Sequence, residues 1–104
     1  MNLIDTHCHI DVEEFDADRD AVLAHSRHAG VTRMLVPAVL ARGWPFLVDL
    51  CRREAGLLPA LGLHPVYLDQ HSDADVAALA EWVERERPVA VGEIGLDYFV
   101  EELD

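Results

Sequence analysis

The sequence contains no lysine, so its eight strongly basic side chains are all arginines. Twenty aspartates and glutamates outnumber them and give a formal net charge of −12 at neutral pH. A surface of this sign repels polyanions, which excludes a broad basic face for nucleic acid. If the protein acts on a phosphorylated substrate, bound cations at one place must reverse the local field.

Cysteine is also scarce, and long apolar runs are missing. Cys8 and Cys51 lack the spacing of a metal finger or a redox motif, and both are expected to be core residues. No apolar run approaches the roughly 20 residues of a membrane-spanning helix. No basic segment precedes an apolar one at the N-terminus, as a secretion signal would require. These absences predict a cytoplasmic protein without a membrane segment.

The 104 residues are enough for one domain, in which short apolar runs alternate with helix-like segments. The runs recur about every 30 residues, which is the length of a strand-helix-strand unit. This alternation predicts an α/β fold with four parallel strands, covered on both faces and joined by three helices. The predicted strands are residues 2–6, 32–38, 57–63 and 89–94. The predicted helices are residues 17–29, a segment from about Pro45 to before Gly56, and a segment from Ser72 or Asp73 to before Pro88.

The stretch NLIDTHCHIDV, residues 2–12, places two acids and two histidines at alternate positions. On an extended backbone these four side chains would point to one side, because strand side chains alternate between faces. Each imidazole could then offer one nitrogen to a divalent ion, while a neighbouring carboxylate orients the other ring nitrogen. The stretch therefore predicts a metal site after the first strand, built from Asp5, His7, His9 and Asp11.

Two later strands also end in side chains that can bind a metal. His64 follows the third predicted strand in the motif GLHP, and Glu93 lies at the end of the fourth. The carboxyl ends of parallel strands meet at one edge, where barrels and open α/β sheets place their active sites. We therefore expect His64 and Glu93 to lie near the two histidines of the first strand.

The fourth strand carries its acid in an apolar setting. Val89, Val91 and Glu93 would share one face, as on a strand that faces the inside of a barrel. Burying an ionised glutamate is costly unless it is paired or bound to a metal. Gly92 and Gly95 flank this acid and would leave room for close approach by a ligand or by backbone.

Three motifs together resemble the TatD family of metal-dependent hydrolases, within the amidohydrolase-like superfamily. They are DTHCHID, GLHP and VGEIGLDYF, and between them they span residues 5–99. The resemblance implies a (β/α)₈ TIM-type barrel, which has roughly 250 residues. Residues 1–104 would then be a truncated single barrel domain, about the N-terminal half, with FVEELD (99–104) beginning the next loop and helix.

The resemblance also implies a site and an activity. His7 and His9 would bind one divalent ion, Glu93 would be shared between two ions, and His64 would contact the substrate phosphate or the nucleophilic water. The ions would be Mg²⁺, Mn²⁺ or Zn²⁺, and metal-activated water would hydrolyse phosphate esters, with DNA as substrate and exonuclease action typical. The family's further ligands lie on later strands, so the chain alone would hold only the N-terminal ligands and would lack activity.

Other interpretations stay open at this point. The chain could be a non-catalytic metal-binding fragment or assembly module, which self-associates through exposed sheet edges. It could also belong to another lineage of metal phosphoesterases, although the acid-bearing fourth strand fits the TatD pattern better. An open flavodoxin-like sheet is the alternative fold, but no glycine-rich phosphate loop follows the first strand.

Four residues allow two roles each. Asp11 and Asp97 are either turn or cap residues or carboxylates that support a metal ligand. Trp44 and Trp82 are expected to be packing residues rather than stacking platforms for bases. No side chain is singled out as a general acid or base.

Overall fold

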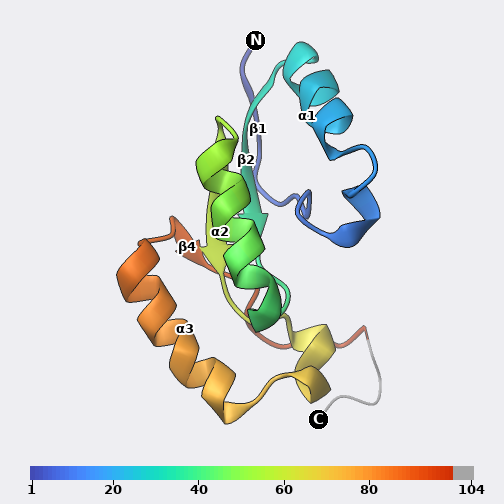
Figure 1. Cartoon of the computed structure of the whole chain (residues 1–104). Coiled ribbons are helices and arrows are strands. Elements are labelled where there is room, and N and C mark those ends of the chain that lie inside the picture. Colours follow the sequence, from blue (N-terminus) through green and yellow to red (C-terminus); the bar gives the residue numbers. More distant parts are fainter. Residues whose placement is uncertain (100–104) are drawn as a thin grey trace.

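A computed structural model describes residues 1–99 and shows one parallel sheet with helices between its strands (Figure 1). The strand order is β1-β2-β3-β4, the same as the chain order. Each strand is connected to the next by a helical segment, so the predicted parallel α/β architecture is confirmed. The strands are β1 (Leu3–Asp5), β2 (Val31–Pro37), β3 (Leu57–Leu61) and β4 (Ala90–Val91).

The helices begin and end where the sequence supplies signals for it. Helix α3 begins with a capping box, in which the Ser72 side chain accepts from the Asp75 N–H and the Asp75 side chain accepts from the Ser72 N–H. Gly30 has a φ of 104° after α1, and it closes that helix as predicted. The α-helices are α1 (Arg19–His28), α2 (Trp44–Arg53) and α3 (Asp73–Glu86). Short 3₁₀ turns add η1 (Glu13–Phe15), η2 (Ala41–Gly43) and η3 (Pro65–Gln70).

The core lies between the sheet and the helices. Helix α1 packs on β2, while α2 and α3 pack on β3. Trp44 is 1% exposed, and its ring centroid lies 5.8 Å from that of Trp82, so both tryptophans pack as predicted. Cys8 and Cys51 are partly buried against this core. The fully buried side chains include Leu23, Val36, Leu47, Leu50 and Leu61.

The two edge strands carry exposed side chains, whereas the prediction had all four strands covered on both faces. Ile4 on the edge strand β1 is 58% exposed, and Val91 on the opposite edge strand β4 is 46% exposed. Among residues 1–99, no further strand pairs with either edge. Nor does any helix of this described part have the length and apolarity to cross a membrane.

The fourth strand is shorter than predicted. β4 ends at Val91, which is in register with Leu61 of β3 but is exposed where Leu61 is fully buried. Glu93 belongs to the segment after the strand, so strand alternation does not set its direction. Beyond it, the loop and helix expected at 99–104 lie outside the described residues except for Phe99. The carboxyl ends of the strands meet at one end of the sheet, near η3 (Figure 1).

Candidate metal centre

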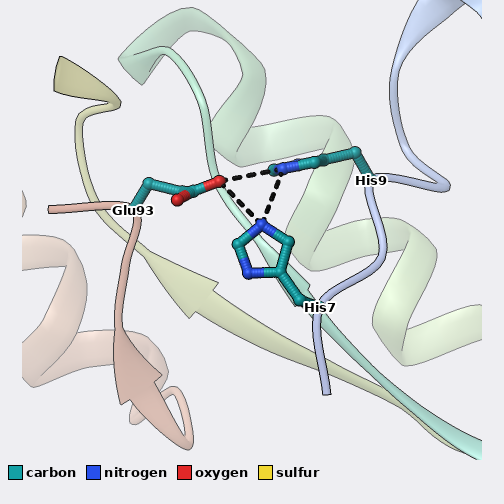
Figure 2. Close-up of side chains that lie close together, drawn as sticks. All are labelled: His7, His9 and Glu93. Carbon is teal, nitrogen blue, oxygen red and sulfur yellow. Dashed lines mark hydrogen bonds and ion pairs between the residues drawn. The ribbon is translucent and has the colours of Figure 1, made fainter. Parts of the chain in front are cut away.

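Two loops bring three potential metal donors together. His7 and His9 follow β1, and Glu93 follows β4 (Figure 2). The Glu93 Oε2 atom lies 3.0 Å from His7 Nε2 and 2.9 Å from His9 Nε2. The two Nε2 atoms are 3.1 Å apart. The structure therefore places the three residues predicted as metal ligands around one point.

A backbone carbonyl orients His9. The Nδ1 atom of His9 lies 3.1 Å from the carbonyl oxygen of Pro37, at the end of β2. Because a carbonyl oxygen only accepts, Nδ1 must carry the hydrogen, and the Nε2 lone pair is free to bind a cation. The predicted acceptor, Asp5 or Asp11, is wrong for this ring. Sequence patterns could not reveal the actual acceptor, because every residue has a carbonyl group.

The two acids near these histidines have other roles. The extended strand ends at Asp5, so the four side chains predicted to share one face are not on one strand. The Asp5 carboxylate accepts the backbone N–H of His7 at 3.0 Å, which fixes the bend that follows the strand. The Oδ1 atom of Asp11 is buried, and it has no hydrogen-bond partner in the described part of the chain. Burial raises the pKa of the Asp11 carboxyl.

Arg19 holds the histidine-bearing loop from the first turn of α1. Its guanidinium donates to the carbonyl oxygens of Ile10, Asp11 and Val12 at 2.8, 3.1 and 2.9 Å. It also forms an ion pair with Asp16 at 2.8 Å. The sequence gives no local signal for this clamp, because its three main acceptors are backbone atoms.

Backbone contacts from the segments directly after β2 and β3 position Glu93. Its N–H donates to the Ala38 carbonyl at 3.0 Å. A Cβ atom on Gly62 would lie 2.3 Å from the Glu93 carbonyl oxygen, so only glycine permits this approach. The buried indole of Trp44 donates to the Gly62 carbonyl at 3.0 Å. The core therefore holds Glu93 in place through two backbone segments.

The glycines that flank Glu93 are not required by a close backbone contact among the described residues, and the approach of a ligand to them stays a prediction. A Cβ on Gly92 would make only ordinary contacts, the nearest at 3.8 Å from Ala60. A Cβ on Gly95 would meet open space, although its φ of 117° suits glycine. The glycine that a close backbone contact requires is Gly62, directly after the neighbouring strand β3, and the prediction overlooked it.

His64 lies beside the three donors and has the opposite protonation pattern to His9. Its Nε2 atom is 3.4 Å from Glu93 Oε2, and its Nδ1 accepts the Val66 N–H at 3.1 Å. Because Nδ1 accepts, Nε2 carries the hydrogen in the neutral ring. His64 thus presents a hydrogen-bond donor at the site, whereas His9 presents a lone pair. His71 lies beside His64, and its Nε2 is 2.7 Å from the His64 carbonyl oxygen.

Asp97 acts as a turn residue in the described structure. Its Oδ1 accepts the backbone N–H of Phe99 at 2.8 Å. This is the local hydrogen bond by which aspartate stabilises a turn. Of the two roles left open for Asp97, the structure therefore shows the turn.

The chemistry of the three donors fits a divalent cation. One donor atom from each of His7, His9 and Glu93 lies within 4.8 Å of the others. Two neutral imidazoles and one carboxylate form a donor set suited to several divalent ions. The Glu93 side chain is 18% exposed, so an ionised carboxylate here gains from a nearby positive charge. The described residues can therefore hold a cation at this place.

A parallel α/β sheet with metal donors at the carboxyl ends of its strands is the arrangement of barrel-type metal proteins. The sequence matches the family described as TatD related DNase over residues 4–104. The chain belongs to this family, as its motifs predicted. The parts of the chain that carry those motifs are the same ones that build the cluster of His7, His9, His64 and Glu93.

Individual relatives agree with this assignment. The uncharacterized metal-dependent hydrolase YjjV of Escherichia coli K12 is 46% identical over 99 residues, covering 92% of this chain and 38% of the relative. Human deoxyribonuclease TATDN3 is 36% identical over 107 residues, covering 94% of this chain and 39% of the relative. The chain thus spans about two fifths of the length of these relatives.

A solved structure confirms the predicted fold class. The crystal structure of YJJV, the TatD homologue of Escherichia coli K12, superposes with a TM-score of 0.88 at 43% sequence identity. The match covers 96% of this chain and 39% of the solved one. The four strands and their helices therefore correspond to the N-terminal half of a TIM-type barrel.

Proposed function

We propose that the protein is a divalent-metal-dependent hydrolase that acts on phosphate esters, with DNA as its substrate. The observation that carries this proposal is the convergence of His7 Nε2, His9 Nε2 and Glu93 Oε2 within 3.1 Å of one another. The names of the relatives, metal-dependent hydrolase and deoxyribonuclease, support the same chemistry. Exonuclease action and a cytoplasmic location complete the proposal.

The donor set suits all three predicted ions. Two imidazole nitrogens and one carboxylate oxygen lie 2.9, 3.0 and 3.1 Å apart. Such a mixed set of donors is suited to Mg²⁺, Mn²⁺ and Zn²⁺. The bound ion would therefore be one of these three.

Glu93 has an oxygen available for a second ion. Its Oε2 faces both histidines, whereas its Oε1 has no hydrogen bond or ion pair with the described residues (Figure 2). A carboxylate in this position can bind one ion with each oxygen. This free oxygen supports the proposed two-ion site, with Glu93 shared between the ions.

The residues around the ions would have separate roles in metal binding and in substrate binding. Bound divalent ions would supply an activated water and neutralise phosphate charge. His9 and His7 would hold the first ion, and Pro37 would keep the His9 ring turned toward it. His64 would bind substrate, because its Nε2–H can donate to a phosphate oxygen beside Glu93.

The alternative function is a metal-binding module without catalysis. The family resemblance implies further ligands on later strands, beyond the part of the barrel that residues 1–104 represent. For the 104-residue chain assayed by itself, we therefore expect metal binding without DNA cleavage. The proposed extent, one truncated barrel domain, leads to the same expectation.

Calorimetric titration tests the ligands. Mn²⁺ should bind the parent chain, and the His7→Ala/His9→Ala variant should lose affinity by about 100-fold or more, since deleting ligands costs more than deleting their supports. The matched control is His25→Ala/His28→Ala, which removes two exposed histidines from α1. Equal binding by all three proteins, or binding by none, would show that His7 and His9 are not the ligands.

A chimera tests catalysis in a complete barrel. Residues 4–99 would replace the matching segment of YjjV, to which the chain is 46% identical. We expect Mn²⁺-dependent cleavage of single-stranded DNA, and a loss of about 100-fold or more on Glu93→Ala. Tight Mn²⁺ binding by a folded chimera that cleaves neither DNA nor bis(p-nitrophenyl) phosphate would favour the metal-binding module.

A further inference from the structure

A cleft opens beside the metal centre, between the loops after β1 and β2 and the turn η3. Its volume is about 520 Å³, which is within the range of small-molecule sites. We call it the Asp11–Tyr67 cleft, after the residues at its two sides. Its polar and aromatic lining residues are Asp11, Glu13, Glu14, Arg42, Phe46, Tyr67 and Gln70.

The cleft adjoins the metal centre on both of these sides. Asp11 follows the proposed ligand His9 by two residues. The Tyr67 ring meets the His64 ring edge-on, with centroids 5.7 Å apart. His64 in turn lies 3.4 Å from Glu93. A substrate with its phosphate at the metal centre would therefore place its neighbouring groups in or near this cleft.

The charges of the cleft exclude a second phosphate. Asp11, Glu13 and Glu14 line it, and Arg42 is its one basic lining residue. The Arg42 guanidinium already donates to Gln70, at 3.3 Å. An occupant must therefore be neutral or positive, and it must offer hydrogen-bond donors. The carboxylates of Asp11, Glu13 and Glu14 would accept these hydrogen bonds.

Tyr67, which is 39% exposed, gives the cleft an accessible aromatic ring. Phe46 is 41% exposed, but the Arg19 guanidinium already lies over its ring, 4.9 Å from the centroid. Exposed rings beside a phosphate site suit the stacking of bases, which contributes about 1–3 kcal/mol per base. Carboxylates accept hydrogen bonds from the exocyclic amines of cytosine and adenine. A nucleobase combines the flat shape, the neutrality and the donors that the cleft requires.

We propose that the Asp11–Tyr67 cleft binds the base of the nucleotide next to the scissile phosphate, with a preference for bases that carry an exocyclic amine. This inference rests on the proposed phosphate-ester function, which places the phosphate at the metal centre. The base would stack on Tyr67 and donate to the acidic wall. Such a contact needs an unpaired base, so the preferred DNA substrate would be single-stranded.

Three ligands distinguish the contribution of the base to affinity from that of the phosphate. Titration of the Mn²⁺-saturated chain with dAMP, dTMP and 2-deoxyribose 5-phosphate compares an amino base, a base without an exocyclic amine, and no base. We expect dAMP to bind about tenfold more tightly than deoxyribose phosphate, the effect of one stacked base. The affinity of dTMP should lie between the two.

Gly43 lines the cleft, so a large side chain at this position would fill the cleft without changing a residue of the metal centre. Gly43 has a φ of −89°, and a Cβ there would meet no atom within 4 Å. Gly43→Phe should fill the cleft and lower dAMP affinity about tenfold, leaving Mn²⁺ and deoxyribose phosphate affinities unchanged. Gly43→Ala adds one methyl group at the same position and should behave like the parent.

The outcomes distinguish this inference from the function on which it rests. Equal affinity for dAMP and deoxyribose phosphate, or no effect of Gly43→Phe on dAMP, would overturn the base site alone. Failure of all three phosphates to bind a chain that does bind Mn²⁺ would overturn the proposed function, and the base site with it. Tighter binding of dTMP than of dAMP would overturn the role given to the acidic wall.

Discussion

At the residue scale, two histidines of one cluster carry their hydrogen on different ring nitrogens. His9 and His64 both lie within 3.4 Å of Glu93 Oε2 through their Nε2 atoms. The partner of Nδ1 decides the difference, since the Pro37 carbonyl demands a hydrogen and the Val66 N–H demands a lone pair. This contrast gives a structural reason to propose His9 as a metal ligand and His64 as a donor to substrate.

Residue types alone predicted which side chains would meet, but not what holds them. His7, His9, His64 and Glu93 could be found because metal-capable side chains at strand ends are rare and conspicuous. The groups that hold these side chains in place were not predicted. Two of them are backbone carbonyls, of Pro37 and Ala38, and the third is a glycine, Gly62, which acts by having no side chain. Such features depend on which strands become neighbours, and a single sequence does not state this.

Cys51 is predicted to be chemically inert in the folded chain. Burial raises the pKa of its thiol to about 12, from an ordinary value of 9.0. The thiolate is the reactive form, so at about pH 8 iodoacetamide should label Cys51 about a thousandfold more slowly than it labels the urea-unfolded chain. Mass spectrometry of the digested protein would measure the rate separately for Cys8, whose pKa is also raised.

The same shift makes stability depend on pH with a definite sign. Above about pH 9 the unfolded chain loses the Cys51 proton while the folded chain keeps it, so stability should fall as pH rises toward 12. Cys51→Ala should remove this part of the slope in urea titrations. Labelling of folded Cys51 at the unfolded rate would contradict the predicted burial of the thiol.

At the scale of elements, the position of Glu93 depends on how closely the segment after β4 approaches Gly62, directly after β3. Gly62→Ala would place a Cβ 2.3 Å from the Glu93 carbonyl oxygen, and a backbone atom cannot move aside cheaply. We expect a loss of about 1–3 kcal/mol in stability, measured by urea unfolding. Mn²⁺ affinity should fall about tenfold or more, because Glu93 must shift.

Gly43→Ala is the control for this substitution, because its Cβ would meet no atom within 4 Å. It should leave Mn²⁺ affinity unchanged. Full Mn²⁺ affinity in Gly62→Ala would mean that the backbone contact does not position Glu93.

Element types were predicted well, and element ends less so. Helix α3 had a signal at each end, the Ser72 cap and Pro88 beyond its last turn, and it forms where predicted. β4 was predicted to run to residue 94, but its pairing with β3 stops at Val91. Pairing is a property of two strands, so the sequence of one strand does not fix where it ends.

At the scale of the whole molecule, the open edges should govern behaviour in solution. Exposed Ile4 and Val91 lie on the two edge strands, whose outer sides pair with no other strand in the described part of the chain. Such edges are templates for pairing with another chain. We expect the 104-residue chain to self-associate at micromolar concentration, seen by light scattering during size-exclusion chromatography.

A pair of matched variants tests this expectation. Val91→Glu puts a charge on the β4 edge and should shift the chain toward the monomer. Val76→Glu puts the same charge at an exposed position of α3, away from the strands, and should leave association unchanged. A monomeric parent chain, or equal effects of both substitutions, would exclude the β4 edge as the contact.

The wide sequence separation within the cluster also determines when the metal centre can form during folding. His7 and Glu93 lie 86 positions apart in the chain, and every strand between them is reached through a helical crossover. Contacts of this separation form late, because the entropy of closing a long loop must be overcome before they add stability. A cation that needs both residues can bind only once β4 has docked. Such an ion would favour the completed fold over every earlier intermediate.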